Sequence, residues 1–152
     1  MKERFIIGVI AGTIAGILKD IPDTAFHFLF QITNITFSDY AGTIALGHRP
    51  AGLAEHLYAV FYEIVFSIFI GIIFVNLAPY FQTKHYLLRG AIYGALVWFS
   101  IRCAVMAFGI RPLVDGDILS ATINSLNSIL YGMILGAIIH YLERKQLSMD
   151  NI

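Results

Sequence analysis

Lys19-Asp20-Ile21-Pro22-Asp23 places three ionisable side chains and a proline inside an apolar stretch. The residues on either side, Phe5–Leu18 and Thr24–Ile32, are apolar enough to lie in lipid. A charged side chain at the centre of a membrane helix costs roughly 2.5–3.5 kcal/mol, so charges at that depth have a partner or a function. This stretch therefore predicts a membrane segment with a polar group inside it.

The composition is that of a membrane protein. Of the 152 residues, 58% are hydrophobic and 13% are charged, whereas about 25% of the residues of an average soluble protein are charged. The net charge is zero, so the composition predicts no binding to nucleic acid. Cys103 is the only cysteine, which excludes an intrachain disulfide and a metal site built from cysteines.

Four hydrophobic segments are long enough to span a bilayer, which takes about 20 apolar residues. They cover about residues 5–30, 55–81, 86–108 and 121–141, and the one long connection is the outer loop 31–53. The predicted fold class is all-α, a polytopic membrane protein with a four-transmembrane-helix bundle in a single domain. The alternative for the first segment, a secretory signal peptide, is disfavoured because no convincing cleavage site follows it.

The placement of lysine and arginine predicts the orientation of these segments. Arg49 and Arg111 fall on one side, and the side that carries both termini holds Lys2, Arg4, Lys84, Arg89, Arg144 and Lys145. We therefore expect both termini to be cytoplasmic.

Small residues recur at four-residue spacing, which lets membrane helices approach closely. The positions are Gly8, Gly12, Gly16, Gly90, Gly94, Ser128, Gly132 and Gly136. This pattern predicts close helix packing inside the bundle, and a homo-oligomer formed through one glycine face is the alternative.

The same pattern is consistent with an internal duplication into two parallel-repeated helical hairpins. Residues 8–12 align with 90–94, which places Asp20 opposite Arg102, and residues 67–71 align with 128–132. A register shifted by one turn, with Ser67 opposite Gly132, fits nearly as well.

Polar residues of all four segments fall at one depth. At 1.5 Å per residue, Asp20 and Arg102 lie roughly 22 Å and 24 Å from the cytoplasmic ends of their helices, and Glu63 lies roughly 12 Å below the outer end of its helix. Asn124 and Asn127 lie near the outer end of the last helix. The candidate ion- or ligand-binding residues are Lys19, Asp20, Asp23, His56, Glu63, Arg102, Asn124 and Asn127.

The charges at this depth nearly balance. Asp20, Asp23 and Glu63 face Lys19 and Arg102, which leaves one carboxylate in excess. An excess acid inside a membrane is typical of a proton-linked or cation-binding site. The leading hypothesis is an outward-facing pocket for small-ion or proton-linked transport, or a channel. The alternative is a non-catalytic scaffold or accessory subunit whose buried charges hold the helices together.

The sequence predicts neither an enzyme nor a cofactor. It contains no nucleophile with an adjacent base and no glycine-rich phosphate loop. Haem is disfavoured because His140 lies at the opposite end of the bundle from His27 and His56. A metal ion held by His56, Glu63 and Asp23 is geometrically conceivable, but no metal site is predicted. Pro22 is expected either to break the first helix or to end it.

Several short segments resemble the YagU-like group of small bacterial inner-membrane proteins of unknown function. They are residues 8–12 leading to Lys19, residues 66–68, residues 87–90 and the polar start of the fourth helix. In that group histidine often stands where this chain has Glu63, and again near Ser128, so a histidine-based mechanism does not carry over. The resemblance implies a four-helix protein of the bacterial plasma (inner) membrane, linked to pH or envelope stress. The expected partners are the lipid bilayer, a small ion or proton, and a second copy of the chain.

Overall fold

The computed structural model describes residues 2–80, 85–114 and 117–149, and these residues form helices joined by short connections, without a strand. In chain order the elements are α1 (Lys2–Thr24), the π-helix η1 (Ala25–Leu29), α2 (Phe37–Leu46), α3 (Gly52–Leu77), the 3₁₀ turn η2 (Ala78–Tyr80), α4 (Tyr86–Ala107), α5 (Arg111–Val114) and α6 (Ile118–Met149). The all-α fold class is confirmed.

Four helices are long and apolar enough to cross a membrane. The spans are Glu3–His27, Gly52–Tyr80, Tyr86–Ala107 and Ile118–Lys145. They correspond to the four predicted segments. The last helix begins at Ile118 rather than at 121 and runs on beyond 141, and the predicted outer loop 31–53 contains a helix of its own, α2.

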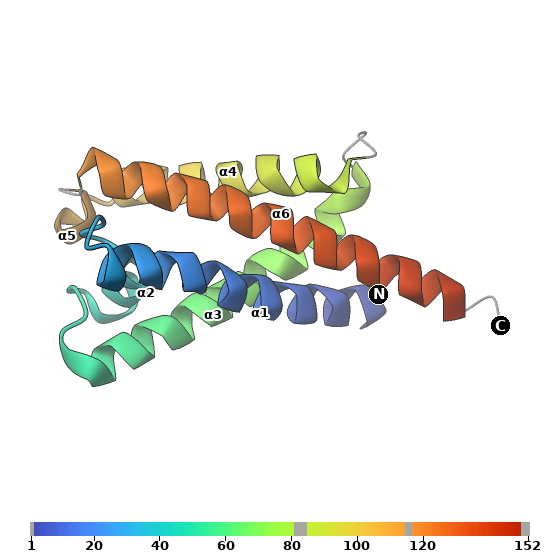
Figure 1. The fold of residues 1–152 in the computed structure, drawn as a ribbon, viewed down its shortest axis with the longest axis horizontal. Helices are drawn as coiled ribbons and strands as arrows, with labels where there is room; N and C mark the ends of the chain where they lie inside the picture. Colours follow the sequence, from blue (N-terminus) through green and yellow to red (C-terminus); the bar gives the residue numbers. More distant parts are fainter. Residues whose placement is uncertain (1, 81–84, 115–116, 150–152) are drawn as a thin grey trace.

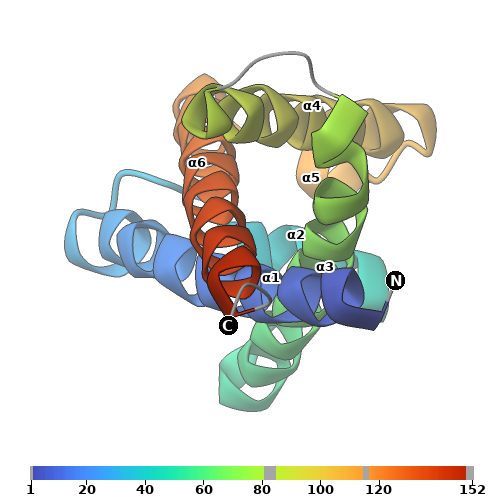
Figure 2. The same ribbon diagram turned by 90° about the vertical axis from the view of Figure 1, so that its right-hand side faces the viewer.

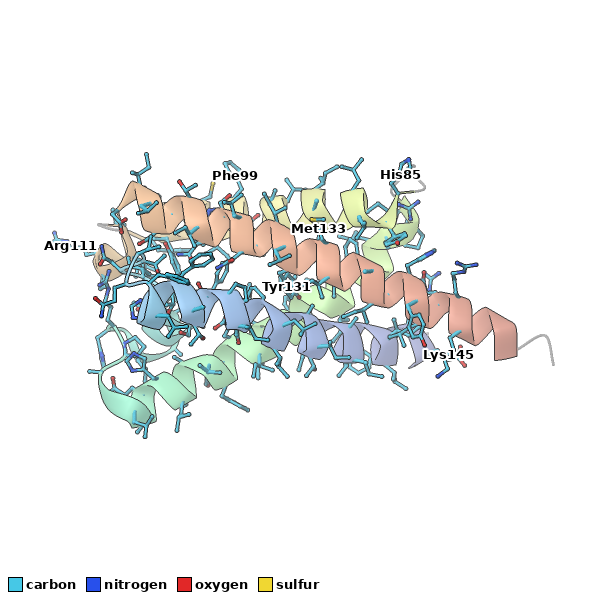
Figure 3. All side chains as sticks on the ribbon, viewed as in Figure 1. His85, Phe99, Arg111, Tyr131, Met133 and Lys145 are labelled. Atoms are coloured by element: carbon cyan, nitrogen blue, oxygen red, sulfur yellow. The ribbon has the colours of Figure 1, made fainter. Side chains whose placement is uncertain are left out.

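The two ends of the bundle differ in what they carry (Figure 1). Both chain termini lie at one end, which we call the terminal end, and α2 and α5 lie at the other, the loop end. Among the labelled side chains, Arg111 marks the loop end, whereas His85 and Lys145 lie toward the terminal end (Figure 3). The two termini therefore share a side, as the sequence predicts, while their cytoplasmic placement stays a prediction.

The long helices pack as two hairpins. Helix α1 packs on α3, α4 packs on α6, and contacts between α1 and α6 join the two pairs. Seen from the terminal end, the four helices have a four-sided arrangement in which α4 lies opposite α1 (Figure 2). A buried apolar cluster fills the terminal half of the bundle: Ile7, Ala11, Ala15, Ile70, Phe74, Val75, Tyr93, Tyr131, Leu135 and Ile139.

Glycines set the distance between the helices of each hairpin. A Cβ added at Gly12 would lie 2.7 Å from the carbonyl oxygen of Ser67, which is closer than side chains approach. Ser67 Oγ donates to the carbonyl of Gly12 at 2.9 Å, and Ser128 Oγ donates to the carbonyl of Gly94 at 2.8 Å. The same bond thus occurs at aligned positions of both hairpins, in the register that pairs Ser67 with Ser128. The shifted register does not reproduce it.

Pro22 neither breaks nor ends the first helix. Helix α1 continues through it to Thr24, and the chain then forms the π-helix Ala25–Leu29. Proline removes its own backbone donor, which leaves the carbonyl one turn earlier without its usual helical partner but does not end the helix here. His27 in this π-helix donates from Nδ1 to the carbonyl of Thr33 at 2.7 Å, which holds the following loop against the helix end.

Asp117 caps the start of α6 and ties it to the loop before α2. Its Oδ2 accepts from the backbone N–H of Ser120 at 3.0 Å, and its Oδ1 accepts from Ser120 Oγ at 2.6 Å and from Asn34 Nδ2 at 3.2 Å. The hydrogen bonds from Ser120 hold the pKa of Asp117 below its ordinary value.

The first prediction concerns the helix seam. Gly12→Ala should lower the free energy of unfolding by about 1–3 kcal/mol, because the added methyl group meets the backbone of α3 and overpacks the seam. The measurement is reversible unfolding in mixed detergent micelles, with the exposed Ala54→Val as the control. Equal stability of Gly12→Ala and the unmodified protein would contradict the close approach.

The second prediction concerns the cap. Asp117→Ala should cost about 1 kcal/mol, the usual value of a lost helix cap. Because the pKa of Asp117 is lowered on folding, its ionised form stabilises the fold above the ordinary pKa of 3.8 and loses this effect as the pH falls through the folded-state pKa. The stability difference between the unmodified protein and Asp117→Asn should therefore be constant above about pH 5 and shrink below pH 4. A difference that does not change with pH would contradict this role.

Candidate functional site

Lys19 is the charged centre of the bundle. Helix α1 buries its side chain so that only 4% of the residue is exposed. The ammonium forms ion pairs with Glu63 of α3 and, at 3.1 Å, with Asp20, and it lies 4.0 Å from the centre of the Phe37 ring. A buried ammonium needs such partners, because removing it from water without compensation costs several kcal/mol.

Asp23, one turn further along α1, joins three helices. Its Oδ2 accepts from the backbone N–H of Phe37, the first residue of α2, at 2.9 Å. Its Oδ1 accepts from Asn127 Nδ2 of α6 at 3.1 Å. A carboxylate is favoured at a helix N-terminus, where unpaired N–H groups carry partial positive charge. Asp23 therefore holds the start of α2 against α1 and α6.

Asp39 is also used by the fold. Its carboxylate accepts from the backbone N–H of Thr36 at 2.8 Å, and its own N–H donates to Thr36 Oγ1 at 3.3 Å. This pair is a capping box at the start of α2.

A cavity of about 470 Å³ lies at the loop end, between the end of α1, the start of α2 and the first turns of α3. Its walls carry four carboxylates and two imidazoles: Asp20, Asp23, Asp39, Glu63, His27 and His56. The Asp20 side chain is 24% exposed and that of Glu63 is 7% exposed. The cavity therefore reaches the buried ion pair from the loop end.

Asp20 and Glu63 share the single cation at the base of this cavity. Asp23 and Asp39 are already engaged by backbone N–H groups. Asp20 and Glu63 both pair with Lys19, so two carboxylates face one ammonium. Counting only this pair and Lys19, one formal negative charge is left over.

Arg102 does not join this group, which corrects the predicted charge balance. Its Nη1 donates to Tyr40 Oη at 3.1 Å and to the carbonyl of Leu113 at 3.0 Å. Burial raises the pKa of Tyr40, so its neutral hydroxyl serves as the acceptor. Counting residues along the helix predicts the depth of Arg102 but not the direction of its side chain. In the structure this side chain points toward α2 and α5.

The remaining predicted site residues divide into two groups. His56 lines the cavity and donates from Nδ1 to the carbonyl of Gly52 at 2.8 Å. Asn127 reaches the site through Asp23, whereas the fully buried Asn124 donates to the carbonyl of Ile35 at 3.0 Å and holds the loop before α2. Five of the predicted residues thus lie together in the structure, while their role in binding stays a prediction: Lys19, Asp20, Asp23, Glu63 and Asn127.

The outer loop contributes to the cavity in a way that the sequence did not predict. Thr36, Ser38 and Asp39 line the cavity, as does His27 from the π-helix. The spacing of Thr36 and Asp39 is a capping-box signature, which could have placed a helix start there. No sequence signal indicates that this helix start faces Asp23.

The metal set of His56, Glu63 and Asp23 is not assembled. In the described part of the chain no three histidine, cysteine or carboxylate side chains are placed to hold a metal ion. Asp23 accepts from a backbone N–H group, and His56 donates to a backbone carbonyl. The residues therefore do not fit a metal centre.

The bundle closes below Lys19. A small cavity of about 30 Å³ lies there, next to Ser67, Ser128 and Tyr131. Tyr131 Oη donates to the carbonyl of Ser67 at 2.8 Å across the two hairpins, and Figure 3 shows Tyr131 midway along the bundle. The buried apolar cluster of the terminal half follows.

Comparison with known proteins gives one match. The model of a family of unknown function, DUF6789, covers residues 3–149. The chain belongs to the DUF6789 family. No curated protein and no solved structure matches the chain. The DUF6789 match does not bear on the resemblance to the YagU-like group, which stays a prediction.

In this DUF6789 protein the described side chains of the site are mainly charged groups paired with one another. Lys19 is enclosed by carboxylates and by the Phe37 ring, and the hydroxyls of Ser67 and Ser128 donate to backbone carbonyls. The carboxylates of Asp20 and Glu63 line the cavity and share one ammonium group, that of Lys19. Such a pair can bind a proton or a monovalent cation in competition with Lys19.

The third prediction distinguishes the ion pair Lys19–Glu63, which the structure contains, from the pair Asp20–Arg102, which the sequence alignment placed opposite each other. Lys19→Met should cost about 3–5 kcal/mol, because it leaves buried carboxylates unpaired. In a double-mutant cycle, Lys19→Met and Glu63→Gln should couple by roughly 1–3 kcal/mol, whereas Arg102→Ala and Asp20→Asn should add within about 0.5 kcal/mol. Unfolding in mixed micelles measures all four changes. Strong coupling of Arg102 with Asp20 would contradict the geometry.

Proposed function

We propose that this protein binds a monovalent cation in the loop-end cavity, in exchange for a proton at Asp20 or Glu63, as part of proton-linked transport across a membrane. The observation that carries the proposal is the surplus carboxylate. Two acids share one buried ammonium at the base of a cavity of about 470 Å³. Inside a membrane bundle an excess acid is costly, and such residues typically mark ion pathways and proton relays.

The roles of the residues follow from their exposure and contacts. Asp20 is the more exposed carboxylate and would meet the cation first. Glu63, which is 5% exposed, would bind the cation once the Lys19 ammonium shifts toward Asp20. Asp23 and Asn127 would keep their mutual hydrogen bond and preserve the cavity wall during this exchange.

Transport requires a second conformation. The apolar cluster that includes Phe74 and Leu135 closes the terminal half of the bundle. Every group of the proposed site comes from one chain, so binding needs no second copy. With both termini in the cytoplasm, the cavity would face the outside in the conformation described here.

A scaffold role is the second candidate, and one observation favours it. Asp23 holds α1, α2 and α6 together through two hydrogen bonds, and the loop carbonyl of Ile35 is fixed by Asn124. Carboxylates used in this way stabilise a bundle without binding anything else. In a scaffold the same would hold for Asp20 and Glu63, and their neutral variants would change stability alone.

The fourth prediction tests transport. Liposomes that contain the full-length protein and an internal pH-sensitive dye should respond when Na⁺, K⁺ or tetraalkylammonium ions of increasing size are added outside. Asp20→Asn and Glu63→Gln should reduce the response to that of empty liposomes, because each removes an acid that exchanges a proton. Asp117 is an acid at the same end of the bundle that does not line the cavity, so Asp117→Asn should keep the dye response.

Two outcomes decide between the candidates. No dye response by the unmodified protein to any cation of the series would overturn proton-linked transport. Full responses by both Asp20→Asn and Glu63→Gln, with lowered unfolding temperatures, would instead support the scaffold.

A further inference from the structure

Glu63 lies where a polar and an apolar cavity meet. On one side it belongs to the acidic cavity at the loop end. On the other it lines a second cavity, of about 390 Å³, between α2, α3 and α4. Its Oε1 is paired with Lys19, while its Oε2 forms no hydrogen bond with any described residue. Glu63 is only 5% exposed, and the free oxygen of its carboxylate leaves a position for a ligand cation.

The second cavity is apolar and aromatic apart from Glu63. Its walls include Phe37, Tyr40, Tyr62 and Phe66. Aromatic faces attract cations that have lost their water, and the ammonium of Lys19 already lies 4.0 Å from the Phe37 ring in this way. A wall of rings around one carboxylate therefore suits a cation with an apolar body.

This apolar cavity opens on the outer surface of the bundle, which would face lipid in a membrane. Ile44 at its rim is 61% exposed, and Tyr62 and Phe66 are each 41% exposed. Ile44, Phe66 and Ile101 also line a neighbouring groove of about 590 Å³ between α3 and α4. An apolar molecule in the bilayer can thus reach Glu63 from the membrane side, without passing through the loop-end cavity.

Size and charge narrow the class of ligand. Cavities of roughly 300–1,000 Å³ hold ligands of drug size, and both cavities that meet at Glu63 fall in this range. In the described residues no three side chains converge on a metal ion, and Lys19, the one cation of the site, is enclosed by acids. The surplus negative charge therefore complements a monovalent organic cation.

We infer that the cation is amphiphilic, a quaternary or protonated amine or a comparable onium ion, with its charge at Glu63 and its apolar body among Tyr62, Phe66 and Ile44. This inference rests on the proposed function, because it names the class of cation that the same carboxylates take. The ligand enters from the bilayer between α2 and α3. Phe66 contacts its apolar part, and Asp20 holds Lys19 while Glu63 is occupied.

The test uses the full-length protein in lipid nanodiscs with tetraphenylphosphonium as the probe. Equilibrium dialysis against empty nanodiscs should show saturable binding of tetraphenylphosphonium, whereas tetraphenylborate, an anion of the same shape, should show none. Glu63→Gln should weaken tetraphenylphosphonium binding at least about tenfold, the effect of losing one desolvated charge contact. Phe66→Ala should weaken it about three- to tenfold through lost apolar contact.

A matched variant controls for nonspecific partition into lipid. Phe99 is 66% exposed on α4 and does not line either cavity, and Figure 3 shows it on the outer side of the bundle. Phe99→Ala should bind tetraphenylphosphonium like the unmodified protein. Because Glu63→Gln removes a partner of Lys19, its fold is checked by thermal unfolding, and Phe66→Ala provides the evidence from a position that carries no charge.

The outcomes separate this inference from the proposed function. Absent binding, or equal binding by the unmodified protein, Glu63→Gln and Phe66→Ala, overturns the inference. If the liposome responses to Na⁺, K⁺ or small tetraalkylammonium ions persist in that case, the proposed function stands. Binding of tetraphenylphosphonium that depends on Glu63 and Phe66, without any proton movement in liposomes, supports the inference and overturns transport.

Discussion

The burial of one ammonium group is the constraint on which the arrangement of this bundle depends. Lys19 is 4% exposed, and a buried cation is tolerated only when acids reach it. Asp20 supplies one acid from the same helix, but Glu63 must come from α3. That contact requires α1 and α3 to lie close together, and the absence of a side chain at Gly12 permits this approach. The Lys19–Glu63 ion pair therefore depends on the close contact between α1 and α3 at Gly12.

The carboxylates at the loop end differ in what they do, although they are chemically alike. Asp23 and Asp39 accept from backbone N–H groups at the start of α2, and Asp117 does the same for α6. These acids replace the hydrogen bonds that the first turn of a helix lacks. Asp20 and Glu63 have no such backbone donor among the described residues and depend on Lys19. The difference in donors is the reason for proposing this pair, and not Asp23 or Asp39, as the cation-binding acids.

The position of Glu63 has a consequence for access. Polar groups line the cavity on one side of it, and aromatic side chains such as Tyr62 and Phe66 line the cavity on the other. In a soluble protein the second side would be covered by other apolar residues. In a membrane bundle lipid covers it, so a lateral opening carries no hydrophobic cost. The proposed binding of an amphiphilic cation depends on this position, because Glu63 lines both cavities.

The sequence by itself determined the four spans, the shared side of the termini and the glycine positions, because hydrophobic length and four-residue spacing are local properties of the chain. It also placed Lys19, Asp20 and Glu63 at one depth, since depth follows from counting residues along a helix. Only the tertiary structure decided which way each side chain faces. It turned Arg102 toward Tyr40 and set α2 against Asp23, because the rotation of each helix about its axis is fixed by its neighbours rather than by its own sequence.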